Sequence, residues 1–337
     1  MKITIKDVAK LANVSVGTAS MAVNGKKGVN EETRRKVLDA VEKLDYRPNH
    51  YARSLITNKS GTIGLIVTDI TNPFFGLIVS FIQKELEKEG YNLLLGISND
   101  KLSNEKKYVE YFLNRNVEGL IIVPSHEKES DLSHLYNLKR LGIPFVFITT
   151  AYNGIQADCI MTDLAKGTYE LTKYLIKNGN KKIFFISGYK DLLLSSLRID
   201  GYKKAYKESA LDCSGDWIFE SYPDYQKGYD TTNRIIQNSI PDAIITVNDI
   251  VAMGVLKCLN ENGINVPEKV SVAGYDDLLY SSMVGTPLTT IRQPIESICT
   301  NSIKILKDRI NGEKYIERRI YLEPELIIRE STIKSSM

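Results

Sequence analysis

Polar side chains that could bind the hydroxyl groups of a small molecule follow several apolar segments of the chain. Asp69 and Asn72 come after the segment from Thr62 to Thr68. Asn248 and Asp276 follow two later segments of the same kind. Such segments are predicted strands of parallel sheets, and ligands bind beyond the carboxyl ends of these strands. Because carboxylates accept hydrogen bonds and amides both donate and accept them, the spacing predicts a binding site for a polyol.

Two further side chains suit the same site. Phe74 and Phe75 stand at the start of a predicted helix, where either ring could stack on a sugar or a purine or fill the core between two lobes. We expect one ring in each role. Arg198 carries a planar guanidinium that can bind vicinal hydroxyls or a carboxylate, or pair with Asp200 at the surface, and spacing alone does not place it at the site. The expected ligand is a sugar or sugar derivative, with a purine as the alternative.

Two acidic residues near the same strand ends have a structural explanation. Asp163 follows a predicted strand and opens a helix, where its carboxylate is expected to accept bonds from free backbone N–H groups. Asp249 either contacts the ligand beside Asn248 or caps the helix that follows. Both residues therefore stay outside the predicted site.

The first 60 residues have the pattern of a three-helix, helix-turn-helix head. Thr4 and Asp7 have capping-box spacing, which predicts a first helix from about Ile5 to Ala12. Asn13 and Val14 form the turn, and Ser15 caps a second helix after the short spacing of a helix-turn-helix. Asn30 caps a third helix, from Glu31 to Leu44. In this motif the second helix lies in the major groove of DNA and reads bases with its first turns.

Positive charge is concentrated in this head. Residues 1–60 contain 12 Lys and Arg against 6 Asp and Glu, a net charge of +6, whereas the whole chain carries +3 and the rest therefore −3. Clustered Lys and Arg replace condensed counterions along a phosphate backbone. The third helix also alternates acidic and basic residues, which is equally typical of a solvated helix face. The charge alone leaves both interpretations open.

The remainder of the chain alternates apolar strands and amphipathic helices. This alternation predicts an α/β fold with two doubly wound parallel-sheet lobes and a cleft between them. The first set of strands is predicted at 62–68, 92–97, 119–123 and 145–149, with helices near 75–90, 104–116 and 132–141. The second set is predicted at 159–161, 183–187, 243–247 and 270–273. A helix at 295–311 and a segment at 319–329 are expected to cross back between the lobes.

Several classes of protein are disfavoured by what the sequence lacks. The chain has no apolar run of about 18 residues and no signal-peptide stretch, so we expect a cytoplasmic protein without membrane contact. Its four cysteines and three histidines are scattered, so no metal and no cofactor is expected, and the cysteines are interpreted as buried thiols. It also lacks the glycine-rich, Gly-x-Ser-x-Gly and His-Glu-x-x-His motifs of common enzymes, so we expect no enzyme activity. A transport protein would not need the basic head.

Five segments together resemble the lactose- and galactose-repressor (LacI/GalR) family of bacterial transcription regulators. They are Thr4–Ala9, Val14–Ser20, Val23–Gly25, Thr33–Val37 and Tyr46–Asn49, and the likeness continues to the C-terminus. The resemblance implies a repressor with a lambda-repressor-like head and a periplasmic-binding-protein-like core. Such a repressor binds palindromic double-stranded operator DNA as a homodimer and responds to a small effector. The absence of a leucine heptad tail favours a dimer over a tetramer.

The resemblance also assigns roles to residues. The stretch from Asn49 to Asn58 matches a hinge that becomes helical on the operator, with Leu55 as a wedge between base steps. In the core, Arg198, Asn248 and Asp276 match effector contacts, while Tyr222 and Tyr225 lie near an aromatic contact and stay outside the predicted site. The DNA-binding residues implied are Thr4, Ser15, Val16, Gly17, Thr18, Ser20, Met21, Asn24, Asn49, Ala52, Arg53 and Leu55.

One position of the second helix departs from the family. Relatives usually carry an arginine that reads guanine where this chain has Met21, and Ala19 replaces the usual valine. Val16, Gly17 and Met21 offer apolar surface without a strong donor. We therefore expect a different operator half-site, read through thymine methyl groups, DNA shape and the hinge.

The expected domains follow from these elements. The head is predicted at 1–48 and the hinge and linker at 49–60. The N-terminal lobe is predicted at 61–160 plus 292–320, and the C-terminal lobe at 161–291 plus 321–331. Within the family, the alternatives to a sugar effector are a purine and a phosphoprotein bound on the lobe surface, as in a carbon-catabolite regulator.

Overall fold

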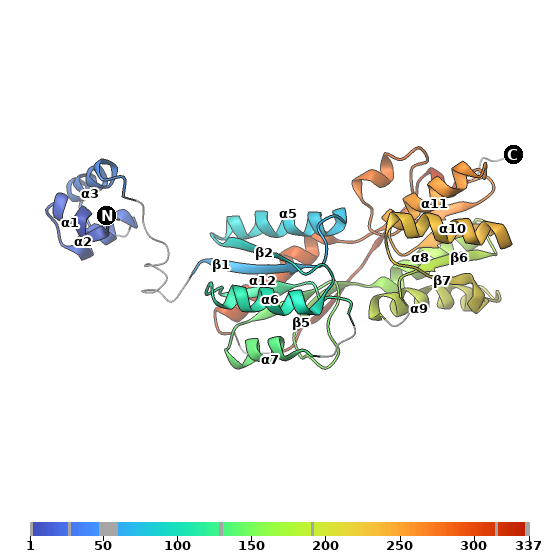
Figure 1. Cartoon of the computed structure of the whole chain (residues 1–337), viewed down its shortest axis with the longest axis horizontal. Coiled ribbons are helices and arrows are strands. Elements are labelled where there is room, and N and C mark those ends of the chain that lie inside the picture. The colour runs from blue at the N-terminus through green and yellow to red at the C-terminus, as the bar shows by residue number, and fades with distance from the viewer. Residues whose placement is uncertain are drawn as a thin grey trace. The chain divides into compact units, whose positions relative to one another are not determined.

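The fold was established from a computed structural model (Figure 1). The structure describes residues 3–25, 28–46, 60–127, 131–189, 192–313 and 316–333. The chain divides into two compact units, residues 1–60 and 61–337. Within the described ranges, no helix has both the length and the apolar character needed to cross a membrane.

The head unit consists of the helices α1 (Ile5–Leu11), α2 (Val16–Val23) and α3 (Glu31–Lys43). Each begins at its predicted cap: the Asp7 carboxylate accepts from the backbone N–H of Thr4 at 2.8 Å, and Ser15 and Asn30 accept from the N–H three residues later. Helices α1 and α3 end one residue earlier than predicted, because Ala12 and Leu44 are their C-caps. The core is made of small side chains that let the helices approach closely: Val8, Ala9, Ala12, Ala19, Ala22, Val37 and Ala40.

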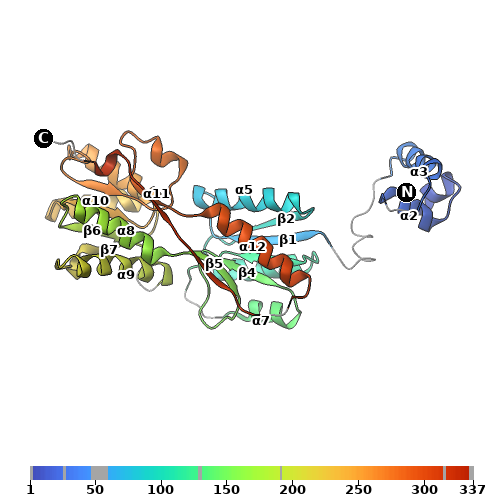
Figure 2. The same cartoon turned by 180° about the vertical axis from the view of Figure 1, so that it is seen from behind.

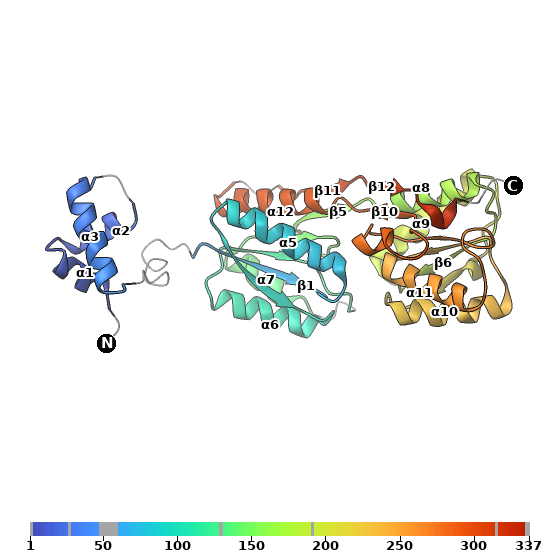
Figure 3. The same cartoon turned by 90° about the horizontal axis from the view of Figure 1, so that it is seen from above.

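The first lobe of the larger unit is built on a six-stranded sheet in which every neighbouring pair is parallel. In the order of the sheet, its strands are β11 (Arg319–Leu322), β5 (Asp158–Thr162), β4 (Phe145–Ile148), β3 (Gly119–Ile122), β1 (Thr62–Val67) and β2 (Asn92–Ile97). Helices α5 (Pro73–Lys88) and α12 (Ile295–Ile310) cover one face, and α6 (Leu102–Leu113) and α7 (Ser133–Arg140) the other (Figure 3).

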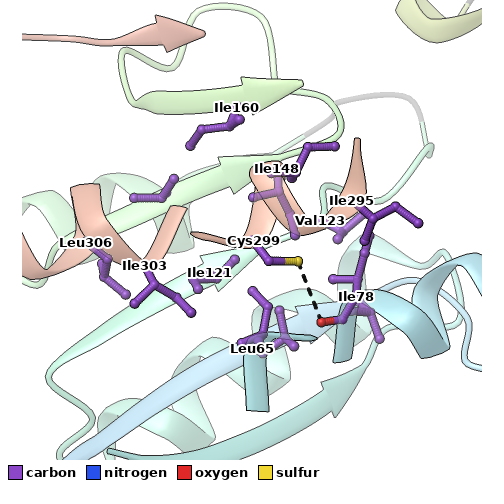
Figure 4. Packing of buried hydrophobic residues seen from close by; sticks show 14 of the residues in the cluster. Leu65, Ile78, Ile121, Val123, Ile148, Ile160, Ile295, Cys299, Ile303 and Leu306 are labelled. Carbon is purple, nitrogen blue, oxygen red and sulfur yellow. Dashed lines mark hydrogen bonds between the residues drawn. The ribbon is translucent and has the colours of Figure 1, made fainter. Parts of the chain in front are cut away.

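Apolar side chains fill the space between this sheet and helices α5 and α12 (Figure 4). Leu65 and Ile121 of the strands are fully buried, as is Ile78 of α5. Cys299 of α12 lies against α5, with its Sγ 3.9 Å from the carbonyl oxygen of Ile78. The strands are apolar along their whole length because helices cover both faces of the sheet, as the sequence pattern predicts.

The second lobe has a four-stranded parallel sheet in the order β7 (Ile218–Glu220), β6 (Ile183–Ser187), β8 (Ala243–Thr246) and β9 (Ser271–Ala273). Its helices are α8 (Leu164–Lys177), α9 (Leu193–Glu208), α10 (Tyr225–Asn238) and α11 (Asp249–Glu261), with the short helix η1 at Gly215–Trp217. Helices α10 and α11 touch through glycine: a Cβ atom on Gly254 would lie 2.1 Å from the carbonyl oxygen of Tyr225.

One grouping of strands made from the sequence is wrong. The prediction places the strand at 159–161 with the second set, but β5 belongs to the first sheet. It pairs with β4 on one side and with β11 on the other. In the pairing with β11, Cys159 lies opposite Arg319, which is 160 residues later in the chain. The sequence pattern shows where a strand is, but not which sheet a strand near a crossing joins.

Three connections join the two lobes (Figure 2). The first runs from β5 to α8, the second from β10 (Thr290–Arg292) to α12, and the third from β11 to β12 (Glu325–Ile327). Strands β10 and β12 pair with each other in an antiparallel two-stranded sheet. The short helices η2 (Leu279–Ser282) and η3 (Glu330–Thr332) complete the described part of the second lobe. The predicted return of the chain after residue 295 is confirmed.

Candidate functional site

A cavity of about 310 Å³ lies between the two lobes, at the carboxyl ends of the strands of both sheets. The structure brings six of the seven predicted effector residues to its wall, from both lobes: Asn72, Phe74, Phe75, Arg198, Asn248 and Asp276. The seventh, Asp69, is not among the lining residues of this cavity. The position of the cavity is the one that parallel sheets provide for ligands.

The side chain of Asp69 forms hydrogen bonds within the turn that follows β1. Its Oδ1 accepts hydrogen bonds at 2.7 Å from both the backbone N–H and the hydroxyl of Thr71, and it lines a smaller depression next to Asn72 and Phe75. A short carboxylate that bonds to the residue two positions later is a common turn arrangement. This depression shares Asn72, Phe75, Asp100, His126, Tyr222 and Pro223 with the cavity, so a role of Asp69 in effector binding stays a prediction.

The start of helix α5 forms one wall of the cavity. Asn72 is the N-cap, and its Oδ1 accepts from the backbone N–H of Phe74 at 3.0 Å. Phe74 is buried in the core of the first lobe, whereas Phe75 is half-buried. The two rings meet edge to face, with centroids 5.3 Å apart and an interplanar angle of 79°. The two roles expected of this pair correspond to this difference in burial, with Phe75 the more accessible ring.

Arg198 is buried in helix α9 and does not form the surface pair with Asp200 that the sequence left open. Its guanidinium carbon lies 4.5 Å from the centre of the Tyr275 ring, and its Nη1 donates to the carbonyl oxygen of Leu194 at 3.3 Å. Its Nε has no hydrogen-bond partner in the described part of the chain. Burial lowers the pKa of Arg198, against the opposing effects of Tyr275 and Asp276. Arg198 thus lines the cavity and holds a buried donor, Nε, that has no partner in the described part of the chain.

Asn248 and Asp249 have different functions at the start of α11. Asn248 is the N-cap, with its Oδ1 2.9 Å from the backbone N of Val251, and lines the cavity. Asp249 is fully buried and accepts from the hydroxyls of Ser281 and Thr290, each at 2.6 Å. Burial raises the pKa of Asp249 to about 6. Asp249 therefore neither caps the helix nor lines the cavity, and it ties α11 to the segments that follow β9.

Asp276 is the most perturbed acid of the site. Burial, and next the charge of Asp249, raise its pKa to about 8, while Arg198 and a hydrogen bond from Gln293 act in the opposite direction. The Nε2 of Gln293 donates to its Oδ1 at 2.6 Å. Because charged and neutral forms of such a carboxyl coexist near neutral pH, Asp276 can accept a hydrogen bond from a ligand or donate one.

The cavity also contains polar residues that the sequence analysis missed, among them Asp100, His126 and Gln293. Asp100 Oδ1 accepts from the backbone N–H of His126 at 2.7 Å and lies 2.8 Å from its Nδ1. Asp100 and His126 follow β2 and β3, so the same strand-end rule could have found them. Gln293 follows β10, which lies outside both main sheets, and no local signal marks it.

The remaining acidic and aromatic candidates lie at three different places in the second lobe. Asp163 caps α8 as expected, accepting from the backbone N–H of Lys166 at 2.9 Å. Tyr222 lines the cavity with its side chain about half exposed, and its ring lies 6.4 Å from that of Tyr189. Tyr225 lines a different depression on the second lobe.

In the head, the side chains of α2 differ in exposure. Val16, Gly17 and Asn24 are exposed, whereas Thr18, Ser20 and Met21 are half-buried. Thr4 and Ser15, both exposed, are engaged in the caps of α1 and α2. The hinge candidates of the sequence analysis lie outside the described residues: Asn49, Ala52, Arg53 and Leu55.

All four cysteines are free; Cys159, Cys258 and Cys299 are buried as predicted, whereas Cys213 is only partly buried. Across the described residues, no group of three or more His, Cys, Asp and Glu side chains could hold a metal ion.

Two models of known protein families match the head and the larger unit of the chain. The family model described as "Bacterial regulatory proteins, lacI family" matches residues 4–49, and that described as "Periplasmic binding proteins and sugar binding domain of LacI family" matches residues 60–329. The HTH-type transcriptional repressor PurR of Pasteurella multocida is 34% identical over 335 residues, which cover 99% of each chain.

Two solved structures are similar to the whole chain. A crystal structure of the lac repressor dimer bound to operator and the anti-inducer ONPF has a TM-score of 0.88 at 25% identity, covering 99% of this chain and 100% of that one. The complex of the transcriptional regulator CelR with cellobiose has a TM-score of 0.74 at 26% identity, covering 98% and 99% of the two chains.

Proposed function

Because the chain belongs to the LacI family of bacterial regulatory proteins, we propose that it binds a palindromic operator as a dimer under the control of a small effector. The chain is a DNA-binding transcriptional repressor and not an enzyme. Supporting the proposal, the capped helices α1 and α2 have helix-turn-helix spacing, and the larger unit encloses a cavity between its lobes. The effector binds in that cavity and shifts the equilibrium between arrangements that differ in operator affinity.

The effector class follows from the polar wall of the cavity. Arg198 has an unpaired buried donor, Asp276 offers carboxyl oxygens, and Asn72 and Asn248 line the same space. A sugar or sugar derivative carries hydroxyls that donate and accept around its whole rim, which such a wall can satisfy. The half-buried ring of Phe75 provides an apolar face for one side of the sugar ring. The related CelR structure holds cellobiose, which is consistent with this class.

A purine is the second candidate, and aromatic rings favour it. Phe75, Tyr189 and Tyr222 all line the cavity, and flat bases stack on such rings. Arg198 and Asp276 could then bind the edge of the base. The number of hydrogen-bonding groups around the wall makes a sugar the leading candidate.

The proposed dimer has a suitable surface on the second lobe. Leu279, Tyr280 and Met283 lie together in and after η2, with 71%, 52% and 69% of their surfaces exposed. Adjacent exposed apolar side chains are typical of protein interaction sites. Two heads are needed to read the two halves of a palindrome, and the related lac repressor is described as a dimer on its operator.

The operator is tested with the full-length protein. Selection from random duplexes should enrich a palindrome whose affinity exceeds that of competitor DNA by at least about a thousandfold. A chain that lacks residues 1–60 serves as the control and should lose this binding. Failure to enrich any duplex, with and without sugars or purines, would refute the proposal.

The effector is tested by thermal unfolding in the presence of monosaccharides, disaccharides, adenine and guanine. A compound that binds only the folded state raises the Tm, and at a hundred times its Kd the stabilisation is about 2.7 kcal/mol. The same compound should change the affinity for the selected duplex. A shift from a purine and none from any sugar would establish the second candidate instead.

A further inference from the structure

Two adjacent residues, Asp276 and Asp277, connect the cavity with the segments between the lobes. Both have left-handed backbones, with φ of 114° and 55°, which residues other than glycine seldom adopt. The backbone N–H of Asp276 donates to the carbonyl oxygen of Ile291 at 2.8 Å. The Asp277 carboxylate binds Arg292 Nε at 2.7 Å and Arg329 Nη2 at 2.6 Å. The dipeptide is thus fixed to β10 and to the segment after β12.

Gln293 joins the same dipeptide to the first connection. Its Nε2 donates to Asp276 Oδ1 at 2.6 Å, and its Oε1 accepts from the hydroxyl of Thr162 at 2.7 Å. Thr162 is the last residue of β5, where the first connection begins, and Gln293 stands on the second connection, between β10 and α12. All three residues are buried, with 7% or less of their surfaces exposed. One amide therefore links a residue of the cavity wall to two of the three connections.

We propose that Gln293 is a positioning residue that transmits changes at Asp276 to the connections between the lobes. The inference rests on the proposed function, in which the effector binds beside Asp276. A donor group of the effector that binds Asp276 draws the carboxylate towards the cavity and weakens the bond of its Oδ1 with the Gln293 amide. A buried amide N–H without an acceptor costs free energy, so the Gln293 side chain turns towards other acceptors. This movement changes the hydrogen bond between its Oε1 and the hydroxyl of Thr162. The connection at the start of α8 then moves with the occupancy of the cavity.

The proposed link can be tested without effector or DNA, by hydrogen exchange of the full-length protein followed by mass spectrometry. The probe is the backbone N–H of Asp163, which follows Thr162 and donates to the carbonyl oxygen of Leu322 at 2.8 Å. Asp276→Gly removes the carboxylate and tolerates the left-handed backbone. This change should accelerate exchange in the peptide that contains Asp163 about tenfold. In the Gln293→Leu background, the same change should accelerate it less than twofold.

Two other variants complete the design. Thr162→Val removes the hydroxyl but keeps the shape of the side chain, so it should reduce the response to Asp276→Gly as Gln293→Leu does. This variant keeps the test decisive if Gln293→Leu folds poorly. Thr172→Val is the matched control, because Thr172 is a buried threonine whose hydroxyl donates within α8, to the carbonyl oxygen of Thr168 at 2.7 Å. It should leave the tenfold response intact.

Equal acceleration by Asp276→Gly in the presence and absence of Gln293, or no acceleration in either, would overturn the inference. Because the samples contain neither effector nor operator, these outcomes are independent of the proposed function. That proposal fails separately, through the duplex selection and the thermal screen.

Discussion

The guanidinium of Arg198 lies above the ring of Tyr275, with 4.5 Å between the guanidinium carbon and the ring centre, and no carboxylate pairs with it in the described part of the chain. A cation over an aromatic face contributes about 0.5–2 kcal/mol, which does not offset the several kcal/mol needed to remove a charge from water. Folding alone therefore gives little reason for a buried arginine at this position. A ligand with hydrogen-bond acceptors gives one.

Arg198→Met should separate binding from stability. Methionine fills similar space without a charge, so the Tm of the effector-free protein should stay the same or rise. A hydrogen bond from a charged group contributes about 1.5–3 kcal/mol, so the affinity for the sugar or purine identified by thermal shift should fall at least about tenfold. Arg234→Met, at an exposed position of α10, is the control and should leave that affinity unchanged. A large loss of Tm with full affinity would contradict the interpretation.

The stability of the protein should depend on Asp276 between about pH 4 and pH 8. Burial raises its pKa to about 8, so the folded state holds a proton that the unfolded chain has already lost at lower pH. Stability is then lost as the pH rises through this window, by about 1.4 kcal/mol per pH unit. Asp276→Asn removes this dependence, so the difference in stability in favour of the variant should grow by about 2 kcal/mol between pH 6 and pH 8.

Denaturant unfolding at a series of pH values measures this difference. Asp200→Asn, at an exposed position two residues after Arg198, is the matched control, and its free energy of unfolding should follow that of the natural protein. Parallel curves for the natural protein and Asp276→Asn would mean that Asp276 titrates normally.

Local rules predicted much of the fold and part of the site. The caps at Ser15, Asn30 and Asp163 follow from a side chain and the N–H three residues later, so a short stretch of sequence contains all the information needed. The strand-end rule predicted Asn248 and Asp276 at one cavity wall, because the carboxyl ends of paired parallel strands meet at one edge of a sheet. At Asp69 the same rule leads to the adjoining depression, where Thr71 donates to the carboxylate within the turn.

Gln293 could not have been found in this way. Its two partners, Asp276 and Thr162, lie 17 and 131 residues away, so its role exists only after both lobes have formed. The wrong grouping of β5 has the same origin, because the sheet that a strand joins depends on β11, far along the chain. Sequence patterns therefore predict structure least well in the segments where the chain passes from one lobe to the other.

Met21→Arg should change the operator preference. Met21 lies half-buried on α2, and an arginine there would offer the bidentate donor that reads guanine in the major groove. The half-site selected by the variant should gain a guanine, with discrimination of about 1–3 kcal/mol at that position. Leu38→Arg adds the same charge at an exposed position of α3. It should strengthen binding to DNA without changing the operator sequence that is preferred. Identical half-sites for Met21→Arg and the natural protein would refute the idea that Met21 sets specificity.

Asp158→Asn should destabilise the first lobe. Asp158 of β5 binds Arg309 of α12 through two bonds, Nε to Oδ2 at 2.8 Å and Nη2 to Oδ1 at 3.0 Å, and both side chains are buried. Removing one charge of a buried ion pair is strongly destabilising, so the free energy of unfolding should fall by about 3–5 kcal/mol in denaturant titrations. Glu317→Gln breaks the more exposed pair with Arg319 and should cost less than about 1 kcal/mol. If the two variants lost equal stability, the buried pair would not be what fixes α12 to the sheet.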